Sequence, residues 1–221
     1  MHSSLRKQNQ SFYEFLVPLV KGLSTEVSLE VASLGVQVHG GMGYIEETGA
    51  AQYLRDARIL TIYEGTTAIQ ANDLVGRKTA RDGGQVALAI AAQMATTEVA
   101  LAARDSAACH AMARRLSAGR KAFVDAVGFV AGQTKPQPNA VFAGSVPYLM
   151  LAGKVVAGWQ MARALIAAED RLAAGEDVDF MRAKIVTAQF YADHILNQAP
   201  SLRDSIVDGA ASVTDLALES F

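Results

Sequence analysis

The sequence predicts an all-α fold, and three observations support this. Alanine is abundant, β-branched residues rarely alternate with polar ones, and apolar residues recur at helical spacing. Glycine pairs and prolines fall between the apolar stretches, where they end one helix and open the next. With 221 residues and 51% hydrophobic content, the chain can bury the core of one large domain or two small ones.

The first eighty residues predict three helices. The first opens at Ser24 or Thr25 and ends at Gly40-Gly41, and a loop follows from Gly40 to Thr48. A short helix is expected from about residue 49 to 58, and another from about 66 to 78. The apolar residues expected to face inward are Val27, Val31, Leu34, Val38, Ile69 and Leu74.

The second part of the chain predicts a helical bundle. The boundary is expected at Arg81-Asp-Gly-Gly84, which divides the chain into domains 1–82 and 83–221. Tyr148, Met150 and Trp159 lie at helical spacings and are expected in the core. The expected helices cover residues 85–116, 120–131, 140–174 with a kink at Pro147, 178–198, and a last segment from Pro200 toward Phe221, with a rigid loop at 134–139.

Composition limits the classes of function. Twenty basic and twenty-two acidic side chains give a net charge of -2, with no basic block for nucleic acid. Cys109 is the single cysteine and predicts a buried helix thiol in a cytoplasmic protein. Residues 140–156 are the most lipid-like stretch, but Pro147 and Lys154 interrupt it, so we expect a buried helix and no membrane span. No cluster of metal ligands stands out.

Glu64 is the candidate catalytic residue. It stands between an apolar approach, Ile59 to Tyr63, and a glycine-threonine turn. If the carboxylate is buried with that approach, it loses hydration and becomes a stronger base. Gly65 lets the backbone pass close to a ligand, and Thr66 can cap the helix that follows. Taken alone, a glutamate before a turn is more often a solvated surface residue.

Three motifs in order change this weighting. Residues 37–44 read Gln-Val-His-Gly-Gly-Met-Gly-Tyr, residues 54–58 read Leu-Arg-Asp-Ala-Arg, and residues 62–70 read Ile-Tyr-Glu-Gly-Thr-Thr-Ala-Ile-Gln. This series resembles the C-terminal helical domain of acyl-CoA dehydrogenases. Residues 85–221 resemble the extra helical region of a longer subgroup that includes methylmercaptopropionyl-CoA dehydrogenase-like enzymes. The resemblance implies a fragment without the N-terminal helical and middle β domains.

The resemblance also implies a reaction. An FAD-dependent enzyme of this family oxidises an acyl-CoA thioester to the trans-2-enoyl-CoA, with Glu64 removing the α proton. Tyr63 and Gly65 would border the acyl group, and the backbone N–H of Glu64 would help to hold the thioester carbonyl. Electron-transfer flavoprotein is the implied electron acceptor, and a homo-oligomer is the implied assembly.

Two sets of residues are implied to bind FAD. Thr66 and Ala68 match positions that line the cofactor. A loop that holds the adenosine diphosphate end of FAD from a neighbouring subunit is matched by Gln37, Val38, His39, Gly40 and Gly41. These glycines could instead only end a helix, and His39 could be a helix-end histidine, so it receives no catalytic role.

Two alternatives stay open. Arg55, Asp56 and Arg58 are expected to form an ion-pair network that fixes the short helix, rather than to act in catalysis. The chain itself is expected to be inactive alone. It could also be a non-catalytic helical module that mediates subunit assembly.

Overall fold

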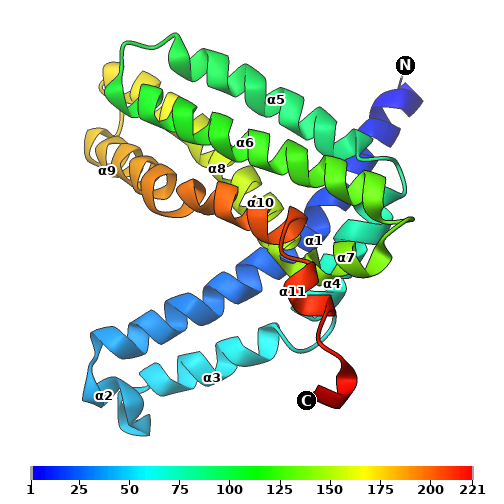
Figure 1. Ribbon diagram of the computed structural model, residues 1–221. Helices are drawn as coiled ribbons and strands as arrows, with labels where there is room; N and C mark the ends of the chain where they lie inside the picture. The colour runs from blue at the N-terminus through cyan, green and yellow to red at the C-terminus, as the bar shows by residue number, and fades with distance from the viewer. Residues whose placement is uncertain (1, 221) are drawn as a thin grey trace.

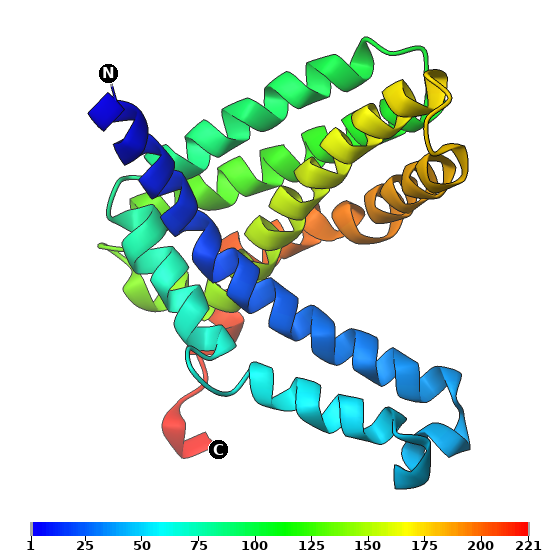
Figure 2. The ribbon, with the colours of Figure 1, turned by 180° about the vertical axis from the view of Figure 1, so that it is seen from behind.

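The computed structural model describes residues 2–220, except for the side chains of residues 2–5, 7 and 8. Every element in that range is a helix, which confirms the predicted all-α fold (Figure 1). The first helix, α1 (His2–Val38), has 37 residues and runs from a compact helical body into a projecting arm (Figure 2). Pro18 lies inside this helix, so the carbonyl of Glu14 lacks its usual helical N–H partner there.

The arm is a helical hairpin. The second half of α1 leads into α2 (Gly41–Tyr44), the short 3₁₀ turn η1 (Glu46–Thr48) and α3 (Ala50–Leu60). α3 returns along α1 and packs against it, away from the body (Figure 1).

A turn at residues 61–66 leads from the arm back to the body. Thr66 caps α4 (Thr67–Asp73), because its side-chain oxygen accepts the N–H of Ile69, as the sequence predicts. The π-helix η2 (Leu74–Ala80) continues the same path. Both elements pack against α1 and α8, so the turn is fixed to the body on one side and to the arm on the other.

The body is a bundle in which α6 and α8 are central and α5, α9 and α10 pack around them. Its elements are α5 (Gln85–Ala102), α6 (Ala107–Gln133), α7 (Pro138–Ala143), α8 (Ser145–Ala173), α9 (Val178–Phe190), η3 (Tyr191–Ile195), η4 (Leu196–Gln198), α10 (Ala199–Val207), α11 (Ala211–Thr214) and η5 (Leu218–Ser220).

One hydrophobic core joins the two parts of the chain. Phe15 of α1 meets Phe123 of α6 edge to face with ring centroids 6.4 Å apart, and Phe123 stacks on Tyr148 of α8 at 6.5 Å. Tyr148 and Trp159 are buried and Met150 packs against the core, as predicted. The Tyr148 hydroxyl lies 2.9 Å from the Thr79 hydroxyl of η2, which satisfies two buried polar groups. The proposed division at residues 81–84 stays a prediction.

Several expected helix boundaries are wrong. The helix expected over residues 85–116 is broken at 103–106, where Ser106 accepts the N–H of Cys109 and caps α6. Because α6 then continues without interruption to Gln133, the separate helix expected over 120–131 does not exist.

The helix expected over residues 140–174 is also divided. It breaks at Gly144, because Pro147 has no N–H for the carbonyl of Ala143 and its ring would clash there. Pro147 is instead accommodated in the first turn of α8. Pro138 opens α7, so the loop that was expected to reach residue 139 ends at residue 137.

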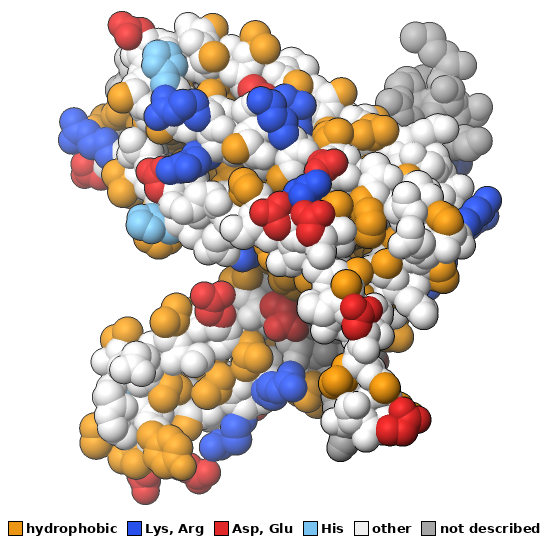
Figure 3. Space-filling view, in the orientation of Figure 1, with side chains coloured by type: hydrophobic (Ala, Val, Ile, Leu, Met, Phe, Trp, Pro, Cys, Tyr) orange, Lys and Arg blue, Asp and Glu red, His pale blue; other side chains and the backbone are white. Residues whose placement is uncertain are grey.

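The apolar stripe of the arm lies on the surface. α1 begins at residue 2 rather than at Ser24, and within the described chain the stripe residues are exposed: Val27, Val31, Leu34 and Val38. Ile69, also expected inside, is 55% exposed, whereas Leu74 is fully buried. Figure 3 shows hydrophobic side chains spread over the arm. The spacing predicted an apolar face correctly, but α3 leaves this face largely uncovered, and only Val31 of the stripe lines the space between α1 and α3.

Two helices, α5 and α8, are long and apolar enough by composition to span a bilayer. α8 is a central helix of the bundle, and half of its most apolar window is buried within it. On α5, Glu98 forms a two-point ion pair with Arg120 of α6, at 2.6 and 3.0 Å. Both helices therefore have partners in the bundle.

We expect Thr79→Val to lower the free energy of unfolding by about 1–3 kcal/mol, because the buried Tyr148 hydroxyl then loses its partner. Urea denaturation would measure this loss. The double variant with Tyr148→Phe removes both hydroxyls, and its cost should be well below the sum of the two single costs. Additive costs would show that the two hydroxyls do not interact.

Candidate functional site

The turn that carries Glu64 has an unusual backbone. Glu64 has a φ of 48°, and Asp177 is the one other non-glycine residue in the described chain with a positive φ. Gly65 follows with a φ of 90°, a backbone conformation that other residues rarely adopt, and a Cβ there would also displace the flexible side-chain amide of Gln70. Glycine is therefore required after the glutamate, and the backbone of Glu64 is held in a conformation that costs energy.

Thr61 closes the turn from inside. Its side chain is buried, its hydroxyl accepts a hydrogen bond from the Arg58 guanidinium, and it donates to the Arg58 carbonyl at 3.2 Å. Its carbonyl accepts the N–H of Thr67 at 3.3 Å. The two ends of the turn are thus joined, and Glu64 is presented at its tip.

The expected burial of Glu64 does not occur within this chain. The glutamate is exposed, and so are its apolar neighbours, with Ile59 50%, Ile62 48% and Tyr63 45% exposed. The turn lies between α3 and α4, where the arm joins the body (Figure 1), and it leaves these side chains largely exposed. The site is an open face, not a closed pocket.

The second candidate set lies at the tip of the arm. Gln37, Val38 and His39 are exposed at the end of α1. The His39 Nδ1 lies 2.9 Å from the Gly35 carbonyl, which is the contact of a histidine at a helix end. Gly40 has a φ of 61°, and a Cβ at Gly40 or Gly41 would meet nothing within 4 Å. The backbone of this loop is open to the close approach of a ligand, so the residues present fit a cofactor loop.

The two sets do not come together. Tyr63, Glu64, Gly65, Thr66 and Ala68 gather at one end of α3, and the residues 37–41 lie at the other end. The 11 residues of α3 place about 16 Å between these ends. One chain therefore presents its glutamate turn and its glycine loop at separate places.

A groove between α1 and α3 was not foreseen from the sequence. It encloses about 730 Å³ and is mostly apolar, and its lining includes Val31, Gly35, His39, Tyr53 and Leu60. Small residues on the facing sides of both helices are the signal that could have indicated it. The groove runs along the arm between the two candidate sets.

The expected network of Arg55, Asp56 and Arg58 is wrong. Arg55 pairs with Glu46 at 3.4 Å, Asp56 accepts from Gln52 at 2.7 Å, and Arg58 binds Thr61. Arg55 also donates to Gln52 at 3.0 Å, so Gln52 links Arg55 to Asp56, whereas Arg58 contacts the turn and neither of the other two.

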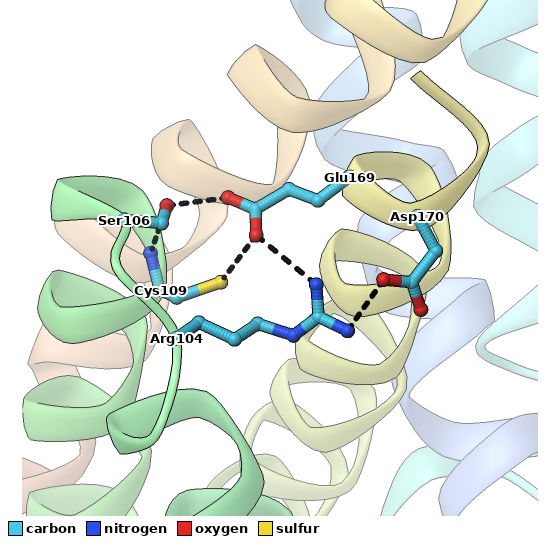
Figure 4. Close-up of polar contacts among 5 residues, drawn as sticks. All are labelled: Arg104, Ser106, Cys109, Glu169 and Asp170. Carbon is cyan, nitrogen blue, oxygen red and sulfur yellow. Dashed lines mark hydrogen bonds and ion pairs between the residues drawn. The ribbon is translucent and has the colours of Figure 1, made fainter. Parts of the chain in front are cut away.

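Cys109 belongs to a polar cluster that joins α6 to α8 (Figure 4). Its thiol donates to Glu169 at 3.2 Å, and Ser106 donates to the same carboxylate. Arg104 bridges Glu169 at 3.4 Å and Asp170 at 2.6 Å. Burial raises the pKa of the Cys109 thiol to about 11, and the hydrogen bond to Glu169 adds to the rise. The thiol stays protonated and is a structural group, as expected.

In the part of the chain that the structure describes, no three His, Cys, Asp or Glu side chains are placed to share a metal ion.

Comparison with known proteins assigns the family. Residues 2–79 match the model "Acyl-CoA dehydrogenase, C-terminal domain", and residues 86–217 match "Acetyl-CoA dehydrogenase C-terminal like". The chain belongs to the acyl-CoA dehydrogenase family, in the helical C-terminal part of it.

Individual relatives narrow the similarity. The chain is 50% identical to the 3-methylmercaptopropionyl-CoA dehydrogenase of Ruegeria pomeroyi, in an alignment that covers 96% of this chain and 36% of that enzyme. It is 32% identical, over 87% of its length, to 33% of the broad-specificity linear acyl-CoA dehydrogenase FadE5 of Mycobacterium tuberculosis. A shorter match, 42% identical over 24% of this chain and 14% of the relative, is to the caffeyl-CoA reductase-Etf complex subunit CarC of Acetobacterium woodii. The chain spans about a third of the length of its first two relatives.

We expect the neutral Cys109 thiol to make stability depend on pH. The folded pKa lies above the value of about 8.5 for an unfolded thiol. The stabilisation is therefore complete below that value and is lost as the pH rises toward 11. Urea denaturation should show that, between about pH 8 and 10.5, the native chain loses about 1–3 kcal/mol more than Cys109→Ser.

Serine keeps a hydroxyl for Glu169 and does not titrate in this range, and both proteins share the same tyrosines. Parallel pH profiles for the two proteins would contradict a raised thiol pKa.

Proposed function

We propose that this chain supplies the base-bearing domain of an FAD-dependent acyl-CoA dehydrogenase. The observation that carries the proposal is the Glu64 turn. A glutamate in a costly backbone conformation, followed by a required glycine and a capping threonine, is held at an open face in a chain of this family. Such strain is maintained where the position of one side chain matters.

The chemistry assigned to the chain is proton abstraction. The Glu64 carboxylate takes the α proton of an acyl-CoA thioester, and the product is the trans-2-enoyl-CoA. When FAD is bound, it accepts the hydride that leaves the β carbon. The backbone N–H of Glu64 is assigned to the thioester carbonyl, where negative charge develops as the proton leaves. Tyr63 and Gly65 border the acyl group.

Exposure of Glu64 in this chain sets a condition on the proposal. A carboxylate is a better base when water is excluded from it. The exposed Ile59, Ile62 and Tyr63 form an apolar rim that another domain or the substrate would cover. The isolated chain is therefore assigned no dehydrogenase activity of its own.

The cofactor residues fall into the same two sets. Thr66 and Ala68, beside the base, are assigned to line FAD at the reacting end. Gln37 to Gly41 are assigned to the adenosine diphosphate end of a second FAD. The length of α3 between the sets supports contacts with two cofactors in an assembly of several chains.

Partners and location belong to the same proposal. The chain acts on an acyl-CoA, and electron-transfer flavoprotein takes the electrons. The complex named for the Acetobacterium relative supports this acceptor. We place the protein in the cytoplasm because of its single buried cysteine.

A second function is assembly. The exposed apolar stripe on α1 favours assembly, since contiguous exposed apolar side chains commonly mark a surface that binds another protein. As a module of this class the chain would form homo-oligomers without catalysis.

Glu64→Gln tests the enzymatic proposal. The chain replaces the matching segment of the Ruegeria enzyme, and the chimera is assayed by dye reduction with 3-methylmercaptopropionyl-CoA. Because glutamine keeps the size and removes the base, activity should fall by about 10²–10⁴-fold. The flavin absorbance should stay unchanged.

Glu176→Gln changes an exposed glutamate in a turn of the body, paired only with the exposed Arg171, and should leave activity intact. A fully active Glu64→Gln chimera would refute the assignment of the base.

Val31→Glu combined with Leu34→Glu tests assembly. Charge on the stripe should prevent burial there, so the 221-residue chain should change from an oligomer to a monomer in light scattering. Val213→Glu combined with Leu216→Glu, which places the same two charges on exposed apolar residues in and just after α11, should leave the oligomer intact. A native chain that is already monomeric would exclude the stripe as a self-association surface.

A further inference from the structure

Two side chains of α1 hold the Glu64 turn at its two ends. Lys21 donates to the carbonyl of Leu60, the last residue of α3, at 2.8 Å. The Glu26 carboxylate accepts from the hydroxyl of Thr67, the first residue of α4, at 2.5 Å. Both contacts join residues about forty positions apart, and both groups are half-buried. The turn is therefore suspended between two polar anchors on one helix.

The Lys21 anchor also reaches the residue before the glutamate. Its ammonium lies 5.5 Å from the centroid of the Tyr63 ring, within the range of a cation–π contact. A carbonyl at the end of a helix lacks an intrahelical donor, so the lysine satisfies it and fixes where α3 stops. Lys21 thus sets the entry to the turn and the placement of Tyr63.

The Glu26 anchor fixes the exit. Thr67 donates its hydroxyl to Glu26 and its N–H to the Thr61 carbonyl. It therefore joins the end of the turn to α1 and to the start of the turn. With entry and exit held, the three residues between Thr61 and Gly65 have little freedom. This restraint can maintain the positive φ of Glu64, which an unrestrained turn would relax.

We propose that Lys21 and Glu26 are positioning residues for the Glu64 base. They touch neither substrate nor cofactor in this assignment, and they act by holding the turn against α1. The inference rests on the proposed function for its catalytic consequence, but the restraint on the turn can be measured without any activity.

Hydrogen exchange on the 221-residue chain tests the restraint. In Lys21→Met and in Glu26→Leu, exchange in a peptide covering residues 61–67 should become about tenfold faster or more, because local opening is no longer opposed. Peptides from α6 and α8 should be unchanged. Lys21→Arg and Glu26→Gln keep a donor and an acceptor and should restore slow exchange.

Lys78→Met is the matched control. Lys78 pairs with Glu14 of α1 at 3.5 Å and does not contact the turn, so its loss should leave exchange at residues 61–67 as it is. Unchanged exchange in both anchor variants, or a general increase over the whole chain, would overturn the inference.

The chimera tests the catalytic consequence. A misplaced base should lower kcat about tenfold or more in both anchor variants. In Glu26→Leu, which leaves the contact between Lys21 and Tyr63 in place, KM should change little. Lys21→Arg and Glu26→Gln should recover most of kcat, which a general loss of stability would not predict.

The two proposals fail separately. An active Glu64→Gln chimera would contradict the assignment of Glu64 as the base, but it would not affect the restraint measured by hydrogen exchange. If the Glu64→Gln chimera is inactive but both anchor variants have a normal kcat, the base is supported and only the positioning role of Lys21 and Glu26 is contradicted.

Discussion

The packing of α1 is the constraint on which the rest of the structure depends. Its first half is fixed in the body through Phe15 and Leu19, and its second half is the longer of the two helices of the arm. Because one helix serves both parts, α3 and the Glu64 turn are placed by whatever holds α1. The polar contacts from Lys21 and Glu26 leave this helix on either side of Gly22 and Leu23, where it still packs against α8.

A catalytic carboxylate usually needs both a fixed position and protection from water, and this chain provides only the first for Glu64. The turn is restrained by the hydrogen bonds of Thr61 and by the anchors on α1, yet it is open to solvent. Rigidity comes from this chain, whereas exclusion of water must come from something that covers Ile59, Ile62 and Tyr63. A domain that supplies a positioned base without a pocket fits an enzyme assembled from several parts.

Local signals in the sequence predicted much of the fold. The Thr66 cap, the buried Cys109 and the core positions Tyr148 and Trp159 follow from residue type and helical spacing. The break at residues 103–106 was missed because its cap, Ser106, stands in an otherwise helical pattern. The apolar stripe was found, but periodicity shows that a face is apolar and not what covers it. Lys21 and Glu26 were missed because their partners lie about forty residues away.

Pro18 gives α1 a mechanical property. A proline removes one backbone hydrogen bond and is where helices most commonly bend. It lies three residues before Lys21, and beyond it Gly22 and Leu23 still pack against α8. Because the glutamate turn is tied to α1 beyond this proline and to α8 through α4, a bend of α1 at Pro18 would shear the turn between the arm and the body.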